Sequence, residues 1–252
     1  MRRNEIPLIE VCVEGIDGLI AAQEAGADRV ELCASLLEGG ITPSFGTVRE
    51  AMKLADIPFH VIVRPRGGDF LYSEAEFASM LADVAALSEL GVAGVVVGCL
   101  TADGDIDEPR MRTLVEAAGP LAVTCHRAFD MTRDPRDALE ALIRSGVGRV
   151  LTSGQRDTAI EGIELIAALV KQAAERIIIL GCGALTPENI GMVRAKTGLT
   201  EMHFASLEDV PSGMRFRNPH VGMGGTELDR EYRNTVTDRA LVKATIAAAR
   251  AG

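Results

Sequence analysis

The sequence predicts an α/β fold, a closed (β/α)8 TIM barrel that forms a single domain over residues 1–252. Three observations predict it. Short runs rich in Val, Ile and Leu recur eight times, each run is followed by a stretch with helical periodicity, and each run ends abruptly in polar or charged residues. Continuous apolar runs are typical of parallel strands buried on both faces, and eight such units close a barrel.

The eight expected strands follow one another along roughly the first 205 residues: 8–13, 29–32, 59–63, 94–97, 121–125, 149–151, 177–180 and 202–205. The expected helices are rich in Ala, Leu and Glu: 17–26, 45–55, 74–90, 109–118, 135–145, 158–174, 187–197 and 238–250. Ser73 and Asp134 stand before two of these helices as capping residues. Gly26 and Gly91 stand just after two others, where a left-handed backbone is needed.

Residues 207–237 lack a regular pattern and are expected to form an irregular excursion before the last helix. Because this segment is too long for an ordinary βα loop, it serves either as a lid over the barrel mouth or as a flexible insertion or subunit contact. The alternative fold is a doubly wound open sheet. Such a sheet usually carries a glycine-rich dinucleotide-binding turn after its first strand, and residues 12–17 contain no GxGxxG motif.

The composition excludes several classes of protein. With a net charge of -10 the chain would repel a phosphate backbone, so we expect no nucleic-acid partner. No window approaches about 18 consecutive apolar residues, and the first residues hold no apolar signal segment, so we expect a cytoplasmic protein without a membrane partner. The five cysteines are an odd number without a CxxC pair, which favours reduced thiols over disulfides.

Side chains along each strand alternate between the barrel lumen and the helix layer. Since the β-branched residues must face the helices, the residues between them point inward. This inward set is largely polar and comprises Glu10, Cys12, Glu31, Cys33, His60, Arg64, Thr124, His126 and His203. Buried charges are costly unless they are paired, so such a set predicts a functional site at the carboxyl ends of the strands, where active sites of this fold lie.

Acid–base chemistry fits four members of this set. Glu10 or Glu31 could act as a general base and His126 or His203 as a general acid, and the same four side chains could hold a divalent metal. Each residue taken singly also has a structural alternative, such as an internal ion pair of Glu10 with Arg64 or a hydrogen-bonded core histidine. Spacing along the sequence does not decide between these.

A small anion could bind at the same end of the barrel. The guanidinium groups of Arg64, Arg66 and Arg127, which follow the third and fifth strands, can fork onto a carboxylate or phosphate. Gly181 and Gly183 follow the seventh strand at a turn before the next helix, where backbone amides would complete an anion-binding seat. No Lys stands at a luminal strand end, which argues against Schiff-base chemistry.

Beyond these patterns, the chain resembles the CutC family, named for copper homeostasis. Seven motifs carry the resemblance, in order along the chain: residues 10–13, 25–33, 38–44, 64–72, 126–130, 151–154 and 201–206. The resemblance implies a TIM barrel, a cytoplasmic location, a homodimer and a role in copper handling. Cys12 and Cys33 match the family's proposed copper-binding thiols, and two thiolates suit soft Cu(I).

Three functions therefore stay open. Copper handling through Cys12 and Cys33 is the function that the resemblance implies. The alternative is a TIM-barrel enzyme or a receptor for a small anionic metabolite, with the Arg, Glu and His cluster as its site, and whether the chain is an enzyme stays undecided. A third class is a non-catalytic interaction protein. Cys99, Cys125 and Cys182 are expected to fill space as small apolar side chains.

Overall fold

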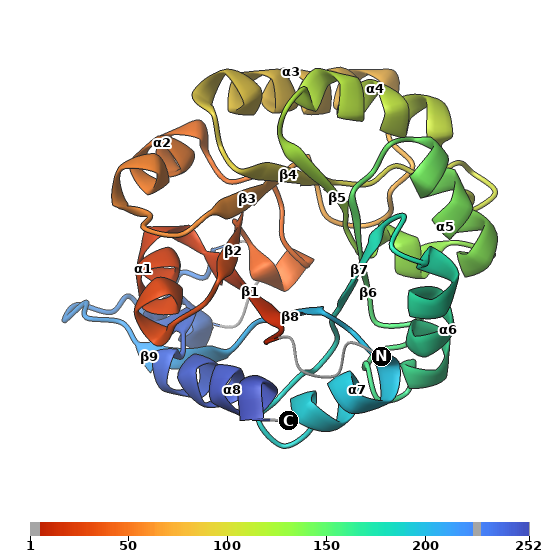
Figure 1. Cartoon of the computed structure of the whole chain (residues 1–252). Coiled ribbons are helices and arrows are strands. Elements are labelled where there is room, and N and C mark those ends of the chain that lie inside the picture. Colours follow the sequence, from red (N-terminus) through yellow and green to blue (C-terminus); the bar gives the residue numbers. More distant parts are fainter. Residues whose placement is uncertain (1–5, 224–227, 252) are drawn as a thin grey trace.

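The computed structural model describes residues 6–223 and 228–251 of the chain. Eight parallel strands form a closed barrel in which each strand pairs with its neighbours in sequence, and β8 closes the sheet by pairing with β1. Helices surround the barrel as an outer ring (Figure 1). The (β/α)8 TIM barrel predicted from the sequence is thereby confirmed.

All eight predicted strands are present, and each boundary lies within one residue of the prediction. The strands are β1 (Leu8–Glu14), β2 (Arg29–Cys33), β3 (Phe59–Ile62), β4 (Gly94–Val97), β5 (Ala122–Cys125), β6 (Arg149–Thr152), β7 (Ile178–Gly181) and β8 (Glu201–Phe204). Such agreement follows from the apolar residues that recur along each run, which are typical of parallel strands buried on both faces.

The eight helices of the ring also match, with two late starts. They are α1 (Gly15–Ala25), α2 (Phe45–Leu54), α3 (Glu74–Leu90), α4 (Glu108–Ala118), α5 (Pro135–Arg144), α6 (Ile163–Ala173), α7 (Ile190–Thr197) and α8 (Arg239–Ala251). Ser73 caps α3 in a reciprocal capping box with Glu76, and Asp134 caps α5, as predicted. Helices α6 and α7 begin later than expected because a turn precedes each of them. In the turn before α7, the Asn189 side chain accepts a hydrogen bond from the Thr186 amide.

Alternation along the strands sorts the side chains as predicted. Ile9, Val11 and Val13 of β1 are fully buried in the large core between strands and helices. On the lumen side, Cys12 lies instead in a separate small cluster of buried side chains with Cys33, Ile62 and Val96. The polar inward set, Glu10, Glu31, His60, Arg64, Thr124, His126 and His203, is buried as well.

A network of buried ion pairs fills the lower lumen, and its arginines were not predicted. Arg29 donates to both Glu10 and Glu201, the latter at 2.7 Å, and Arg149 donates to the two oxygens of Glu201 at 2.7 and 3.0 Å. Arg29, Arg149 and Glu201 are the first residues of β2, β6 and β8, so the network lies toward the amino-terminal end of the barrel. Glu10 is therefore paired with Arg29 rather than with Arg64, its expected structural partner.

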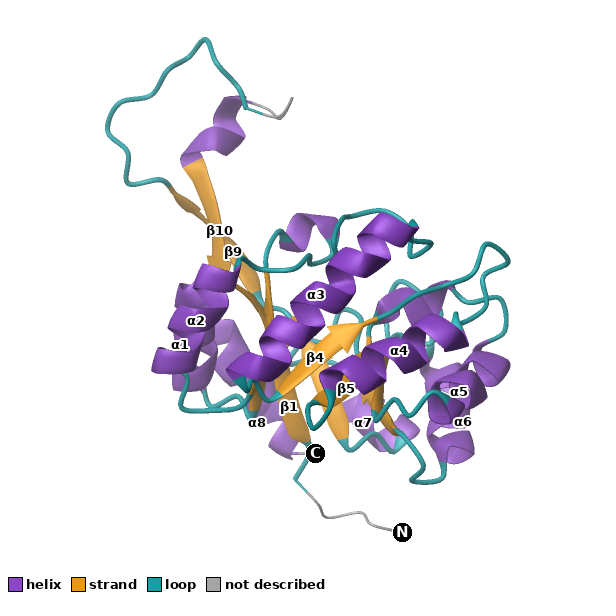
Figure 2. Ribbon diagram, turned by 90° about the horizontal axis from the view of Figure 1, so that it is seen from above, coloured by secondary structure: helices purple, strands orange, loops and turns teal. Residues whose placement is uncertain are grey.

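The excursion at 207–237 is not irregular throughout, which corrects the sequence prediction. Its two ends form an antiparallel hairpin of β9 (Leu207–Pro211) and β10 (Arg233–Thr237), with a short 3-10 helix, Leu228–Tyr232, before β10. Figure 2 shows this hairpin arm extending away from the barrel body rather than across it. Among the described residues, no helix is both long and apolar enough to span a bilayer.

Removing the central cation of the buried network should destabilise the fold strongly. In Arg29→Met, Glu10 and Glu201 each lose a charged partner in the lumen, and we expect the free energy of unfolding to fall by about 3–5 kcal/mol. Urea denaturation followed by circular dichroism measures it. Arg144→Met, which breaks an exposed pair with Glu108, should leave the midpoint nearly unchanged. Equal midpoints for both variants would show that the network does not stabilise the barrel.

Candidate functional site

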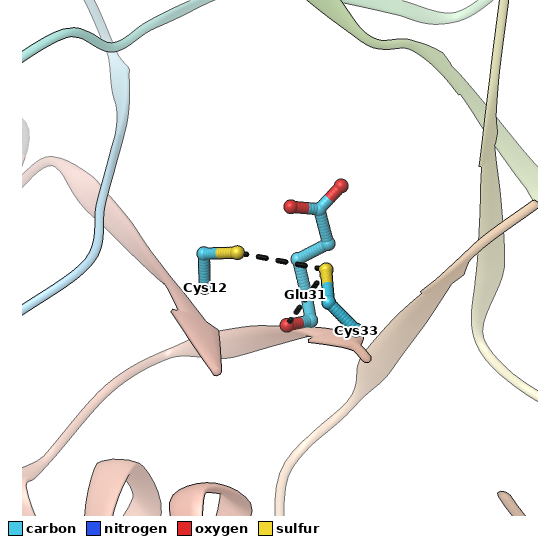
Figure 3. Close-up of side chains that lie close together, drawn as sticks. All are labelled: Cys12, Glu31 and Cys33. Carbon is cyan, nitrogen blue, oxygen red and sulfur yellow. Dashed lines mark hydrogen bonds between the residues drawn. The ribbon is translucent and has the colours of Figure 1, made fainter. Parts of the chain in front are cut away.

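Two cysteine side chains face each other in the lumen, from neighbouring strands. Cys12 of β1 stands opposite Glu31 in the parallel register, and Cys33 follows two residues later on β2. Their sulfur atoms are 3.6 Å apart, and both side chains are buried. Figure 3 shows the two thiols pointing toward one another with the Glu31 carboxyl group above them. The ligand atoms of these three side chains all lie within 4.8 Å of one another.

Apolar groups enclose this thiol pair. Ile62 and Val96 pack beside it within the lumen, and Leu36, in the loop after β2, packs over it. The same loop returns close to Cys33 at Gly40, where φ is +86° and a Cβ atom would lie 3.2 Å from the Cys33 sulfur. Glycine at this position therefore satisfies both the left-handed backbone and the close approach.

The charges around the pair favour one thiolate. The hydrogen bond with Cys33 lowers the pKa of Cys12 to about 5, assisted by His203 and opposed by burial. The same hydrogen bond and burial raise the pKa of Cys33 well above its ordinary value. Burial raises the pKa of Glu31 well above its usual range. The directions of these shifts favour ionisation of Cys12 over that of Cys33 and Glu31.

His203 links the thiol pair to the ion-pair network below. Its Nδ1 atom lies 2.8 Å from Glu10 Oε1, and its Nε2 atom lies 3.8 Å from Glu31 Oε2. Burial alone would lower the pKa of His203, but hydrogen bonding to Cys12 and Glu10 and the charges of the two carboxyl groups raise it well above its ordinary value. Three of the four predicted acid–base residues, Glu10, Glu31 and His203, are therefore brought together.

His126, the fourth predicted acid–base residue, lies apart from this group at the end of β5. Its Nδ1 atom accepts a hydrogen bond from the Ala128 amide at 3.2 Å, and its ring lies 4.9 Å from that of Phe70. Burial lowers the pKa of His126 to about 3, so the ring is neutral at physiological pH. Because Nδ1 accepts, the proton of the neutral ring is assigned to Nε2. The structure does not bring His126 into the ligand group around Cys12.

Each of the three predicted anion-binding arginines donates to acceptors within the protein. Arg64 is buried and donates to the carbonyl oxygens of Glu38, Gly40 and Gly68. Arg66 pairs with Glu76 at 2.6 Å and with Asp69 at 3.0 Å. Anion binding by Arg64 and Arg66 stays a prediction. Most of their N–H groups already donate hydrogen bonds to the loops at the barrel mouth.

Arg127, which follows β5, is held in a similar way. Its Nε atom donates to Asp130 at 2.8 Å, and its Nη2 atom donates to Ser153 Oγ at 2.6 Å and to the Arg156 carbonyl at 3.2 Å. The side chain is nevertheless half-exposed. Arg127 therefore combines a fixed orientation with access from solvent.

Gly181 and Gly183, the predicted anion seat, are packed against protein. A Cβ atom at Gly181 would lie 2.2 Å from a methyl carbon of Leu199, and one at Gly183 would lie 2.8 Å from Cβ of Ser153. The Gly183 carbonyl also accepts from the Ala159 amide. Close packing explains both glycines without a ligand, and their anion binding stays an untested prediction.

A family model described as the CutC family matches residues 7–207. This chain belongs to the CutC family. A family protein CutC from Mesorhizobium japonicum is 76% identical, with 98% of this chain and 96% of that protein covered. A human relative named copper homeostasis protein cutC homolog is 44% identical, over 94% and 86% of the two chains. CutC from Streptococcus agalactiae superposes with a TM-score of 0.75 at 35% identity, and 78% of this chain and 97% of that one are covered.

The boundaries of the CutC match separate the barrel from the arm. The matched range ends at residue 207, where β9 begins, so it contains the barrel strands and the thiol pair but leaves out nearly all of the hairpin arm. Cys99, Cys125 and Cys182 are also buried and free, as expected of space-filling side chains. Within this CutC barrel, Cys12 and Cys33 are the two cysteines that face each other.

The paired thiols should titrate asymmetrically. Because the pKa of Cys12 lies near 5, below its ordinary value, we expect thiolate absorbance in the ultraviolet to appear as the pH rises through about 5. The step should vanish in Cys12→Ser and move to higher pH in His203→Phe, which removes a hydrogen bond that favours the thiolate. Cys99→Ser is the matched control and should keep the step. A wild-type step at the ordinary thiol pKa would contradict the assigned thiolate.

Proposed function

We propose that this CutC protein takes part in copper homeostasis by binding Cu(I) between Cys12 and Cys33. The observation that carries the proposal is the pair of buried sulfur atoms 3.6 Å apart. Bonds from thiolate sulfur to a comparable metal ion are about 2.3 Å long, so two of them reach about 4.6 Å end to end and both sulfurs can contact one ion. The names of the human and mouse relatives, copper homeostasis protein cutC homolog, support the same role.

The donor set suits a soft, singly charged ion. Thiolate sulfur prefers Cu(I) over hard cations such as Mg²⁺ and Ca²⁺, which take oxygen ligands. Two thiolates around Cu(I) leave one net negative charge, and the raised pKa of His203 favours an imidazolium beside Cys12 that offsets it. Binding of a second thiolate would release the Cys33 proton, so Cu(I) affinity should rise with pH.

Access to the thiols would run past Leu36. This side chain packs against the cluster that contains the pair, and it also lines a pocket of about 370 Å³ together with Leu37 and the base of the hairpin arm at Leu207, Arg233 and Thr235. Leu37 is largely exposed at the edge of this pocket. Displacement of a three-residue 3-10 turn, Leu36–Glu38, is a smaller change than opening of the barrel itself.

Removal of both sulfurs should abolish copper binding. We expect one Cu(I) per wild-type chain in competition with a chromogenic Cu(I) chelator, and none in Cys12→Ser with Cys33→Ser. The matched control is Cys99→Ser with Cys125→Ser, which removes two buried thiols from the outer core and should keep full stoichiometry. Unchanged stoichiometry in the Cys12 and Cys33 double variant would refute the proposal, provided that its circular dichroism spectrum matches that of wild type.

We further propose that the protein works in the cytoplasm as a homodimer joined through the hairpin arm. The arm exposes large apolar side chains well away from the barrel core: Met214 at 60%, Phe216 at 75% and Val221 at 50%. Exposed apolar groups gathered on a projecting segment are typical of subunit contacts. Tyr232 gives this loop a defined shape, since its ring lies 5.0 Å from the Arg217 guanidinium and its hydroxyl accepts from the Asn218 amide.

Polar substitutions on the arm should weaken self-association. Sedimentation velocity should show wild-type dimers and a shift toward monomers in Met214→Ser with Phe216→Ser, because the pair loses apolar area that a partner would bury. Met192→Ser, on α7, removes a similarly sized side chain that is 38% exposed outside the arm and should leave the dimer intact. A wild-type protein that stays monomeric at every concentration would disprove the dimer.

A further inference from the structure

A second pocket opens at the carboxyl end of the barrel, away from the thiol pair. It has a volume of about 530 Å³ and lies between the loops that follow β3, β4 and β5. Phe70, Leu100 and Met131 supply its apolar surface, and Arg127 is its basic side chain. Pockets of this size, with an apolar body and few polar groups, are typical of sites for small organic molecules.

Arg127 is preorganised at this pocket. Asp130, which also lines the pocket, accepts from Arg127 Nε, Thr152 Oγ1 and the amides of Ser153 and Gln155, so its oxygens are fully used. No hydrogen bond involves Nη1 of Arg127 among the described residues, whereas Nε and Nη2 are held. Asp69 lines the pocket as well, and its Oδ1 atom accepts from Arg66 Nη2 and from the Leu71 amide. The pocket therefore offers a free guanidinium donor, and each of its two carboxylates is paired with an arginine.

Two buried donors lie behind the pocket wall. The Phe70 ring has the Arg64 guanidinium carbon 5.1 Å from its centroid and the His126 ring at 4.9 Å. Within the described structure, Arg64 Nε and His126 Nε2 have no hydrogen-bond partner, although both side chains are more than nine-tenths buried. Both atoms carry a proton, so what each lacks is an acceptor. Orphaned buried donors are rare, and a bound ligand is one reason for them.

We propose that this mouth pocket binds a small organic carboxylate with an apolar or aromatic body. Arg127 Nη1 receives the carboxylate, and Phe70, Leu100 and Met131 contact the apolar body. The Arg64 guanidinium on the Phe70 ring adds positive charge near this wall of the pocket, which favours an anion over a cation. The site is independent of the copper proposal, because none of its lining residues belongs to the group around Cys12.

Calorimetric titration with three probes tests the ligand class. Phenylacetate has an aromatic ring and a negative charge. Phenylacetamide has the ring without the charge, and inorganic phosphate has negative charge without the ring. We expect phenylacetate to bind with one site per chain, and the other two probes to bind at least about tenfold more weakly, since a hydrogen bond to a charged group contributes a roughly ten- to hundredfold difference in affinity. Equal binding of phenylacetate and phenylacetamide, or no binding of phenylacetate, overturns the proposal.

Two variants of the full chain locate the site. Arg127→Met removes the donor, and Met131→Trp fills the pocket from a side chain that is 68% exposed, so its effect on folding is small. Both should weaken phenylacetate binding at least about tenfold. Arg133→Met is the matched control, because Arg133 lies nearby, is 66% exposed and pairs with Asp105 outside the pocket. Wild-type affinity in Met131→Trp would overturn the assignment to this pocket.

The cysteine double variant separates this inference from the copper proposal. Cys12→Ser with Cys33→Ser should bind phenylacetate like wild type, while Met131→Trp should keep its Cu(I) stoichiometry. Loss of phenylacetate binding in a folded cysteine double variant would contradict independent sites. If the wild type fails to bind Cu(I), the copper proposal fails, and the phenylacetate titrations still decide the proposal for the mouth pocket.

Discussion

Closing eight parallel strands into a barrel creates a lumen that water hardly reaches, so a charged side chain that points into it is costly unless it is paired within the protein. The lower lumen meets this requirement with ion pairs in which Arg29 and Arg149 neutralise Glu10 and Glu201. Above them, His203 contacts both Glu10 and Glu31. Cys12 and Cys33 therefore have paired polar groups as well as the apolar Ile62 and Val96 as neighbours.

The close packing of the lumen also requires glycine at two positions, one in β4 and one just after it. A Cβ atom at Gly94 would lie 2.6 Å from the His60 ring, and one at Gly98, just beyond β4, would lie 2.5 Å from the His126 ring. These positions must stay empty of side chains because imidazole rings from β3 and β5 reach across β4. The large histidine side chains on either side of β4 are thus accommodated by glycines that have no side chain, so two histidines fit into the closed barrel.

Features that depend on a short stretch of sequence could be predicted, and contacts between distant segments could not. Strand positions and inward parity depend on runs of a few residues, so Cys12 and Cys33 could be placed in the lumen from the sequence. The pairing of Arg29 with Glu201 could not, because it depends on how β8 meets β1 when the barrel closes, with Glu10 opposite His203. Arg29 alternates with the outward residues of β2 and so points into the lumen. A charged residue at the first position of a buried strand could therefore have indicated a buried ion pair.

Loop residues were predicted less well than strand residues for a related reason. Arg64 was expected to face an anion because its position after β3 is fixed by the strand. Anion binding there stays a prediction, but the sequence did not reveal that the guanidinium donates to carbonyl oxygens of two loops, whose conformations no short-range pattern specifies. The hairpin arm was missed similarly, because pairing of β9 with β10 joins residues more than twenty positions apart and the strands bury little apolar surface.

Arg64 nevertheless connects the two candidate sites. One of its terminal nitrogens donates to the Gly40 carbonyl, in the loop that approaches Cys33, and the other donates to the Gly68 carbonyl, in the loop that lines the mouth pocket. Since a buried arginine tolerates few unpaired donors, the loop over the thiols and the wall of the mouth pocket are held in register by the same charge.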